Sequence, residues 1–303
     1  MVRSVVSLIV MVYLAALGLV AQAAPAVPAR EVSSSASVVF LNPGFSNEPF
    51  WVGYSDFMQA AADSLGMRLR ILYGERDPQR ILRDARSVLA DSDQPDYLVF
   101  VNEMYVGPEL LRLFAASPIK TFSLHSTLTP EQQSIIGGPR EQYRNWIGSL
   151  IPNDEEAGYW MAKALIGKLR GRSGSLLAFA GVRHTPSSSL REQGLQRALA
   201  EHPEVRLQQL VHGEWKRQRA YEQAQMLLQR YPDVRLVWSA NDEMAFGVMQ
   251  AAAEQGRQLR YAALNNSARV LEARVDGLIE VLASGHFLLG ACALVMLHDH
   301  AKG

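Results

Sequence analysis

An Asn-Asp pair, Asn241-Asp242, stands between an apolar run and a helical pattern in this sequence. The apolar run, residues 234–238, predicts a buried strand, and apolar residues at helical spacing follow it as far as Gly256. We expect Asp242 to cap that helix, which leaves the Asn241 amide at the carboxyl end of the strand, where open α/β sheets hold small ligands. An amide offers one acceptor and two donors without net charge. The pair therefore predicts noncovalent binding of a neutral, hydroxylated ligand, and an ordinary capped turn without a ligand is the alternative.

Other side chains at expected strand ends suit the same chemistry. Phe50-Trp51 opens a helix after the first strand, although consecutive aromatic residues start helices poorly. A sugar ring presents a flat C–H face that an aromatic ring can bury while the hydroxyls are bonded at its rim. The alternative is that one of the two rings packs between the sheet and its helix. Glu103 follows the strand expected at residues 97–101 and projects either into the same cleft or into solvent at its rim.

Residue combinations that would perform catalysis are absent from the sequence. It contains no Gly-x-Ser-x-Gly elbow, no Walker loop, no Gly-x-Gly-x-x-Gly and no His-Glu-x-x-His. His298 and His300 are two residues apart, and side chains at that spacing do not share a helix face, which argues against a metal site. We therefore expect a binding protein without enzymatic activity, cofactor or metal, and a secreted hydrolase is the weaker alternative.

Strands and helices alternate regularly around these residues. The expected strands lie at residues 38–41, 69–73, 97–101, 120–124, 175–180, 206–211, 234–238 and 259–263. Continuous apolar strands between helices predict parallel sheets that helices cover on both faces. About 280 residues after the N-terminal segment exceed what one open sheet needs, so we expect an α/β fold with two lobes.

The segment Asn241-Asp242-Glu243-Met244-Ala245 resembles a motif of the type I periplasmic solute-binding proteins, in the branch of the ribose- and galactose-binding proteins. Glu48-Pro49-Phe50-Trp51 matches that family's Asn-Pro-aromatic-aromatic signature except at its first residue. The resemblance covers nearly the whole chain after the N-terminal segment. It implies a two-lobed fold in which each lobe is a parallel sheet sandwiched by helices and a small solute binds between the lobes.

The resemblance also implies further ligand-binding positions. Trp215 stands where the family places a ligand-stacking aromatic residue, and Arg191 matches a family position as well. Where ribose-type members carry Asp, Arg, Asp and Gln, this chain has His125, Gln193, Asn265 and Ser284. Because charge-assisted hydrogen bonds are about twice as strong as neutral ones, we expect weak or absent ribose binding. The expected ligand-binding residues are Phe50, Trp51, Glu103, His125, Arg191, Gln193, Trp215, Asn241 and Asn265.

The resemblance predicts where the chain divides into lobes. The family's backbone crosses between lobes at positions that correspond to Pro152 and Ala283, so one lobe is expected from residues 37–151 plus 284–303 and the other from residues 152–283. Family members continue beyond the last helix into a third crossover and a final strand, whereas this sequence ends at residue 303. We expect either a longer chain or a pair of lobes that lacks the third hinge strand.

The N-terminus has the features of a secretory signal peptide. Arg3 precedes an apolar run at residues 5–20, and Ala21-Gln22-Ala23 offers small residues at the positions that a signal peptidase reads. No cysteine follows the run, which argues against a lipid anchor, so we expect residues 1–23 to be removed and the protein to be periplasmic. The single cysteine, Cys292, lies in an apolar stretch and is expected to be a buried, inert thiol.

The charge balance limits the classes of partner. Thirty basic side chains balance thirty acidic ones, which leaves no electrostatic footprint for nucleic acid. The leading interpretation is a monomeric periplasmic substrate-binding protein that closes on a small neutral sugar or sugar-like solute for an ABC transporter. The alternative is a ligand-sensing periplasmic receptor for a membrane histidine kinase or a chemoreceptor.

Overall fold

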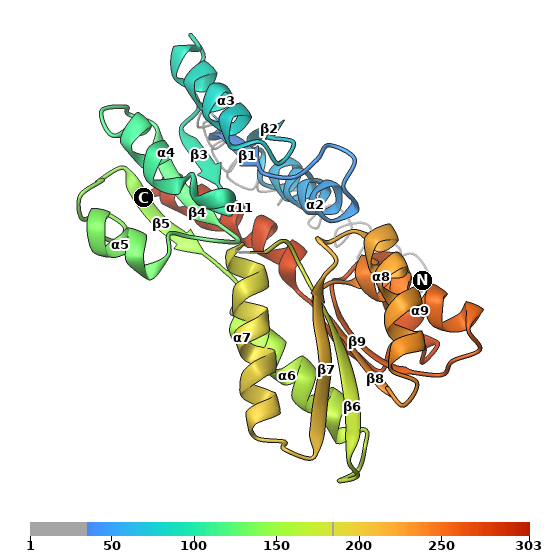
Figure 1. The fold of residues 1–303 in the computed structure, drawn as a ribbon. Helices are drawn as coiled ribbons and strands as arrows, with labels where there is room; N and C mark the ends of the chain where they lie inside the picture. The colour runs from blue at the N-terminus through green and yellow to red at the C-terminus, as the bar shows by residue number, and fades with distance from the viewer. Residues whose placement is uncertain (1–34, 184) are drawn as a thin grey trace, which may run out of the picture. The chain divides into compact units, whose positions relative to one another are not determined.

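The computed structural model describes residues 35–183 and 185–303 of the chain. Ala36–Gly303 forms one compact unit (Figure 1). The expected signal peptide, residues 1–23, lies outside the described residues. Within the described part of the chain, no helix combines the length and the apolar character needed to cross a membrane.

The first half of this unit folds around a five-stranded parallel sheet with the order β2-β1-β3-β4-β5. Its strands are β1 (Ser37–Asn42), β2 (Arg68–Tyr73), β3 (Tyr97–Phe100), β4 (Lys120–Leu124) and β5 (Trp146–Leu150). The helices between them are α2 (Pro49–Leu65), α3 (Pro78–Ala90), η1 (Glu103–Tyr105), α4 (Gly107–Phe114) and α5 (Pro130–Ile136). Alternate residues of β1 enter two separate cores, because side chains of a strand point to opposite faces of the sheet.

The second half repeats this plan with the strand order β10-β9-β8-β6-β7. Its strands are β6 (Gly174–Ala180), β7 (Val205–His212), β8 (Leu236–Ser239), β9 (Arg260–Leu264) and β10 (Val281–Ala283). The helices are α6 (Asp154–Gly167), α7 (Pro186–Ala200), α8 (Arg217–Arg230), α9 (Asp242–Glu254) and α10 (Ala268–Val275). All strand pairs are parallel. Two parallel sheets flanked by helices confirm the expected two-lobed α/β fold.

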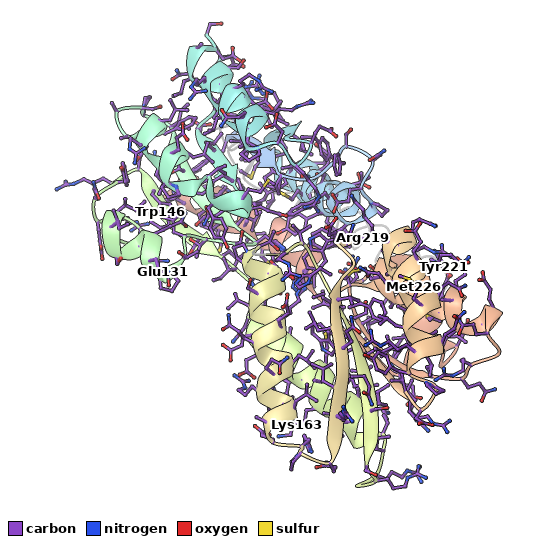
Figure 2. All side chains as sticks on the ribbon, viewed as in Figure 1. Glu131, Trp146, Lys163, Arg219, Tyr221 and Met226 are labelled. Atoms are coloured by element: carbon purple, nitrogen blue, oxygen red, sulfur yellow. The ribbon has the colours of Figure 1, made fainter. Side chains whose placement is uncertain are left out.

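Two fully buried tryptophans anchor the packing of the two sheets. Trp146 of β5 donates its indole N–H to Ser123 Oγ at 3.3 Å and is labelled in Figure 2. Trp238 of β8 donates its indole N–H to the carbonyl oxygen of Gly158 at 3.3 Å. Both rings therefore bury a large apolar surface while their single donor stays satisfied.

The C-terminal helix α11 (His286–Lys302) returns to the first sheet, where it packs against α2 and β4. Gly290 lies at the contact with α2, and a Cβ atom there would stand 2.5 Å from Met58 Cγ. Glycine at this position therefore allows the two helices to approach closely.

Cys292 is exposed on α11, so the prediction of a buried thiol was wrong. The helix buries residues that recur at steps of three and four: Gly290, Ala293, Leu294 and Leu297. Cys292 falls between these positions and shares the outer face with Leu288, Val295 and Met296, which are also exposed. The stretch is apolar on both faces, so its sequence alone did not show which face the fold would cover.

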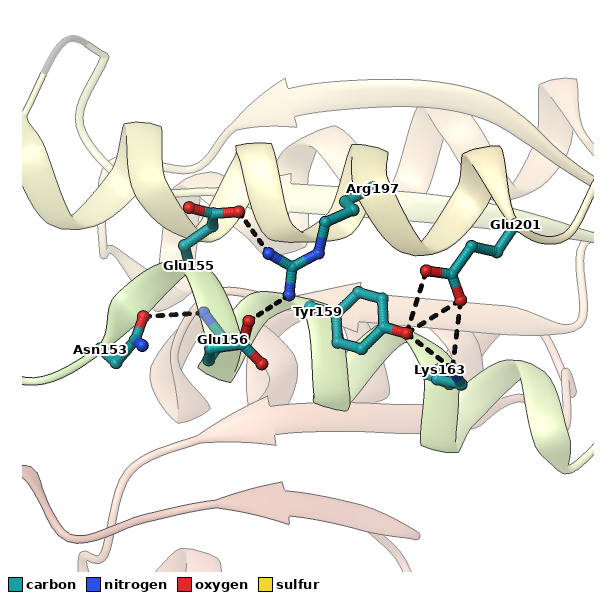
Figure 3. A network of polar contacts seen from close by, with 7 residues as sticks. All are labelled: Asn153, Glu155, Glu156, Tyr159, Lys163, Arg197 and Glu201. Atoms are coloured by element: carbon teal, nitrogen blue, oxygen red, sulfur yellow. Dashed lines mark hydrogen bonds and ion pairs between the residues drawn. The ribbon is translucent and has the colours of Figure 1, made fainter.

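Helices α6 and α7 lie close together in the second half. A Cβ atom on Gly194 would stand 2.0 Å from the carbonyl oxygen of Glu155, and one on Gly158 would stand 2.2 Å from that of Arg191. A polar network runs along the same contact (Figure 3) and joins Asn153, Glu155, Glu156, Tyr159, Lys163, Arg197 and Glu201. The network lies along the contact of α6 with α7, the helix whose first turns carry pocket residues.

Candidate functional site

A pocket lies at the carboxyl edges of the two sheets, where loops and helices follow the strands. Its empty volume, including the part open to solvent, is about 510 Å³. The lining residues are Glu48, Phe50, Trp51, Arg76, Glu103, His125, Ser126, Thr185, Pro186, Ser187, Arg191, Trp215, Asn241 and Leu264. The structure thus brings together seven of the nine expected residues, namely Phe50, Trp51, Glu103, His125, Arg191, Trp215 and Asn241.

Aromatic side chains line the pocket from both halves of the protein. The ring centroids of Phe50 and Trp51 are 5.0 Å apart, with their planes at 86°. Trp51 is 2% exposed and packs in the core that also contains Phe40 and Tyr54, whereas Phe50 is half-buried. Trp215 is half-buried in the loop before α8, and its ring covers Gly181, where a Cβ atom would stand 1.9 Å from the indole. Phe50 and Trp215 therefore present more ring surface to the pocket than Trp51 does.

On the side of the first sheet, Arg76 bridges two carboxylates. Its Nε donates to Glu48 Oε2 at 3.0 Å, and its Nη1 donates to Glu103 Oε1 at 2.6 Å. Burial raises the pKa of Glu103, and the nearby Arg76 opposes that shift. Glu103 thus lies in the pocket lining and not in solvent at the rim, with its carboxylate already paired.

On the side of the second sheet, Arg191 belongs to a buried ion-pair network. Its Nε donates to Asp154 Oδ1 at 2.7 Å, and its Nη1 donates to the carbonyl oxygen of Ala240 at 2.7 Å. His286 Nε2 lies 3.1 Å from the same oxygen of Asp154. Burial by itself would raise the pKa of Asp154, but Arg191 and His286 hold it well below its usual range. The guanidinium carbon of Arg191 lies 5.5 Å from the ring centroid of Trp215, which connects this network to the pocket wall.

His125 lies between the aromatic wall and the ion-pair network. Its ring centroid is 5.5 Å from that of Phe50 and 5.6 Å from that of His286. Its φ angle of 64° is in the left-handed region, which few residues other than glycine adopt. Burial, together with the nearby His286 and Arg191, lowers the pKa of His125 to about 3, so its ring is neutral at pH 7. Its buried Nδ1 has no hydrogen-bond partner among the described residues.

Asn241, and not Asp242, is the N-cap of α9, so the predicted capping role of Asp242 was wrong. The Asn241 Oδ1 accepts a hydrogen bond from the Met244 N–H at 2.9 Å, and its Nδ2 donates to the carbonyl oxygen of Trp215 at 3.2 Å. Asp242 points away and accepts hydrogen bonds from Asn265 and Ser267. Asn241 still lines the pocket, where one donor hydrogen and one acceptor lone pair of its amide are left for a ligand.

Two of the expected residues, Gln193 and Asn265, do not line the pocket. Gln193 is exposed on α7, because two residues correspond to more than half a helical turn and Arg191 occupies the side that faces the pocket. Asn265 is buried after β9, and its Nδ2 donates to Asp242 Oδ1 at 2.9 Å. The position of Gln193 around its helix directs that side chain to solvent, and the hydrogen bond to Asp242 holds the Asn265 side chain away from the pocket.

The remaining lining residues were not among the expected ligand-binding residues: Glu48, Arg76, Ser126, Thr185, Pro186, Ser187 and Leu264. Arg76 follows the end of β2 by three residues, so the strand-end rule that selected Glu103 would also have selected it. His286 was missed because its partner Asp154 is 132 residues away in the chain. Among the described residues, no group of three His, Cys, Asp or Glu side chains could hold a metal ion.

Two parallel sheets with a pocket of aromatic and polar side chains at their carboxyl edges define a two-lobed α/β protein of the kind that binds a small molecule. A family model for a periplasmic binding protein domain matches residues 149–303. The chain belongs to the type I periplasmic binding proteins, in the branch of the ribose- and galactose-binding proteins.

The chain is also similar to individual periplasmic binding proteins. The fold matches the crystal structure of a periplasmic sugar-binding protein from Pseudomonas fluorescens with a TM-score of 0.81 and 55% identity, over 88% of this chain and 80% of that one. The ribose import binding protein of Escherichia coli strain K12 is 24% identical over 214 residues, which are 70% of this chain and 66% of the relative, just under two thirds of its length. The corresponding protein of Haemophilus influenzae is 22% identical over 90% of this chain and 89% of the relative.

Proposed function

We propose that this protein is the periplasmic receptor of an ABC importer and that it closes on one neutral sugar or sugar-like solute. The observation that carries the proposal is the placement of Phe50 and Trp215 on the two sides of one pocket, with polar atoms of His125 and Asn241 beside them. Aromatic rings suit the C–H faces of a sugar, and uncharged polar atoms suit its hydroxyls. The sugar-binding and ribose import proteins described above support the same class of ligand.

The pairing of charges in the pocket supports a neutral solute. Arg76 is engaged by Glu48 and Glu103, and Arg191 is engaged by Asp154. Internal carboxylates therefore already compensate both guanidinium charges, so neither offers an anionic ligand an unpaired positive charge. Ribose-type relatives carry a charged residue at the position of His125, so we expect the preferred solute to differ from ribose.

The proposal includes the remaining features of such a receptor. The signal peptide is cleaved near Ala23, and the protein acts as a periplasmic monomer with no catalytic turnover and no affinity for nucleic acid. One lobe comprises residues 37–151 plus 284–303, and the other comprises residues 152–283. The assignment of α11 to the first lobe is supported by its packing against α2. Contacts that a solute makes with both lobes at once would stabilise the closed form.

A thermal-shift screen tests the proposed class of ligand. The panel contains pentoses, hexoses, sugar alcohols, uronic acids and sugar phosphates, each at millimolar concentration. A solute at 100 times its dissociation constant should stabilise the protein by about 2.7 kcal/mol, which shifts the midpoint of unfolding clearly. We expect stabilisation by at least one neutral sugar and less by ribose. Stabilisation by charged sugars alone, or submicromolar affinity for ribose, would contradict the proposal.

Trp215→Ala is expected to weaken binding of the solute found in that screen at least fivefold. The change removes a stacking face worth about 1 kcal/mol or more beyond its buried area. Isothermal titration calorimetry measures the loss. Trp160→Ala is the matched control, because Trp160 is 58% exposed on α6 and does not line the pocket. Equal affinities of the Trp215→Ala variant and the wild type would show that this ring does not touch the ligand.

A further inference from the structure

A second pocket lies at the amino edge of the second sheet, at the opposite ends of its strands from the solute pocket. Strand β9 reaches both, because Arg260 at its start lines the second pocket and Leu264 at its end lines the first. Four steps along a strand separate the two by roughly 13 Å. The second pocket has an empty volume of about 1150 Å³, including the part open to solvent. Its lining residues are Lys168, Leu169, Arg172, Ser173, Arg235, Gln258, Leu259, Arg260 and Glu280.

The lining of this pocket is strongly cationic. Its ionisable side chains are four cations and one carboxylate, a formal balance of +3 in a chain whose total is zero. Glu280 pairs with Arg260 at 2.8 Å and with Lys168 at 4.0 Å. Arg172 and Arg235 are exposed, and neither has a carboxylate partner among the described residues. Two guanidinium groups therefore face the pocket without a counter-charge.

The same edge of the first sheet shows a different arrangement. A pocket there is also lined by arginines, but Arg68 pairs with Asp93 at 3.0 Å and Arg70 pairs with Asp91 at 3.0 Å. The formal charges of the side chains that line this pocket sum to zero. Since the two sheets share one plan, position at a sheet edge does not by itself produce an excess of positive charge.

Compensation of the negative end of a helix explains only part of the excess positive charge in this pocket. Lys168 is the C-cap of α6 and Arg172 donates its Nε to the carbonyl oxygen of Leu169, so both can compensate the negative end of that helix. Arg235 precedes β8, and its side chain makes no hydrogen bond or ion pair with the described residues. Arg235 thus remains without an internal function that its charge would serve.

We infer that this second pocket binds phosphate-bearing anions through Arg172 and Arg235. Planar guanidinium groups donate paired hydrogen bonds that match the oxygens of a phosphate. The phosphate could belong to a small soluble anion or to the headgroup of an anionic lipid, and both share this chemistry. The site is separate from the solute pocket and does not depend on its ligand.

The inference is tested with sodium pyrophosphate in calorimetry and with vesicles of phosphatidylglycerol and phosphatidylcholine in co-sedimentation, all at one ionic strength. We expect the wild type to bind at least one of these probes and the Arg172→Gln/Arg235→Gln variant to bind it at least tenfold more weakly. Binding of pyrophosphate alone identifies a soluble anion as the partner, and binding of vesicles alone identifies a lipid headgroup.

Arg68→Gln/Arg70→Gln is the matched control, since it removes two arginines from the corresponding edge of the first sheet. It should bind the probe as the wild type does, and circular dichroism should show that both variants are folded. The inference is overturned if the wild type binds neither probe. It is equally overturned if the two double variants lose affinity to the same extent, because the effect would then reflect general surface charge.

Discussion

Replacing Arg191 with alanine is expected to lower the free energy of unfolding by about 3–5 kcal/mol, the usual cost of removing one partner of a buried ion pair. Arg191 is 4% exposed, and its loss would leave the carboxylate of Asp154 and the carbonyl oxygen of Ala240 buried without this donor. His286 alone would then face the Asp154 carboxylate. The cost is high because an uncompensated charge in a low-dielectric interior is poorly solvated.

Urea unfolding measures this loss, and Arg197→Ala provides the comparison on the same helix. Arg197 also pairs with carboxylates, those of Glu155 and Glu156, but its side chain is 39% exposed. Exposed pairs contribute about 1 kcal/mol or less, so the control should change stability little. Similar losses in both variants would show that the Arg191 network is solvated and contributes no more than a surface pair.

Lowering the pH from 8 to 4 is expected to destabilise the wild type by about 3 kcal/mol relative to His125→Asn. A histidine in the unfolded chain binds a proton below about pH 6.5, whereas the pKa of about 3 keeps folded His125 neutral. The unfolded state therefore binds more protons in this window, and stability is retained above pH 6.5 and lost as the pH falls. About 2.5 pH units at about 1.4 kcal/mol each give the expected size.

Asparagine is the suitable replacement because it does not titrate and tolerates the left-handed backbone of residue 125. The other ionisable groups near the ring, His286, Asp154 and Arg191, are common to both proteins, so their effects largely cancel in the difference. Denaturant unfolding at pH 8, 6 and 4 gives the two stability curves. Curves that run parallel over this range would show that His125 is protonated in the folded protein or is accessible to water.

The fold could be predicted from the sequence because its signals are local. Each apolar run of strand length is followed by a helical pattern, and such alternation has few solutions other than parallel sheets covered by helices. The short strand β10 was not predicted, since three residues carry too little periodicity. Helix α5 was also not predicted, although the capping box of Thr129 and Gln132 was a usable sequence signal.

The sequence by itself determined which segments end at the pocket, because the carboxyl ends of parallel strands meet at one edge. It therefore placed Phe50 and Glu103 near that edge, and the family resemblance added Trp215; all three line the pocket. Only the tertiary structure decided the direction of each side chain. The position of Gln193 around helix α7 directs its side chain to solvent. The Asn241 amide oxygen accepts a hydrogen bond from the Met244 N–H, so part of its hydrogen-bonding capacity is taken up in capping α9.

Tertiary structure alone also created the network of Asp154, Arg191 and His286, whose members are up to 132 residues apart. No periodicity links such residues, since their proximity follows from the way the helices and sheets pack. The same holds for Cys292, because an apolar helix is buried only on the side where another element covers it. Local patterns thus specify elements and their order, while burial, pairing of charges and side-chain direction depend on contacts between elements distant in the chain.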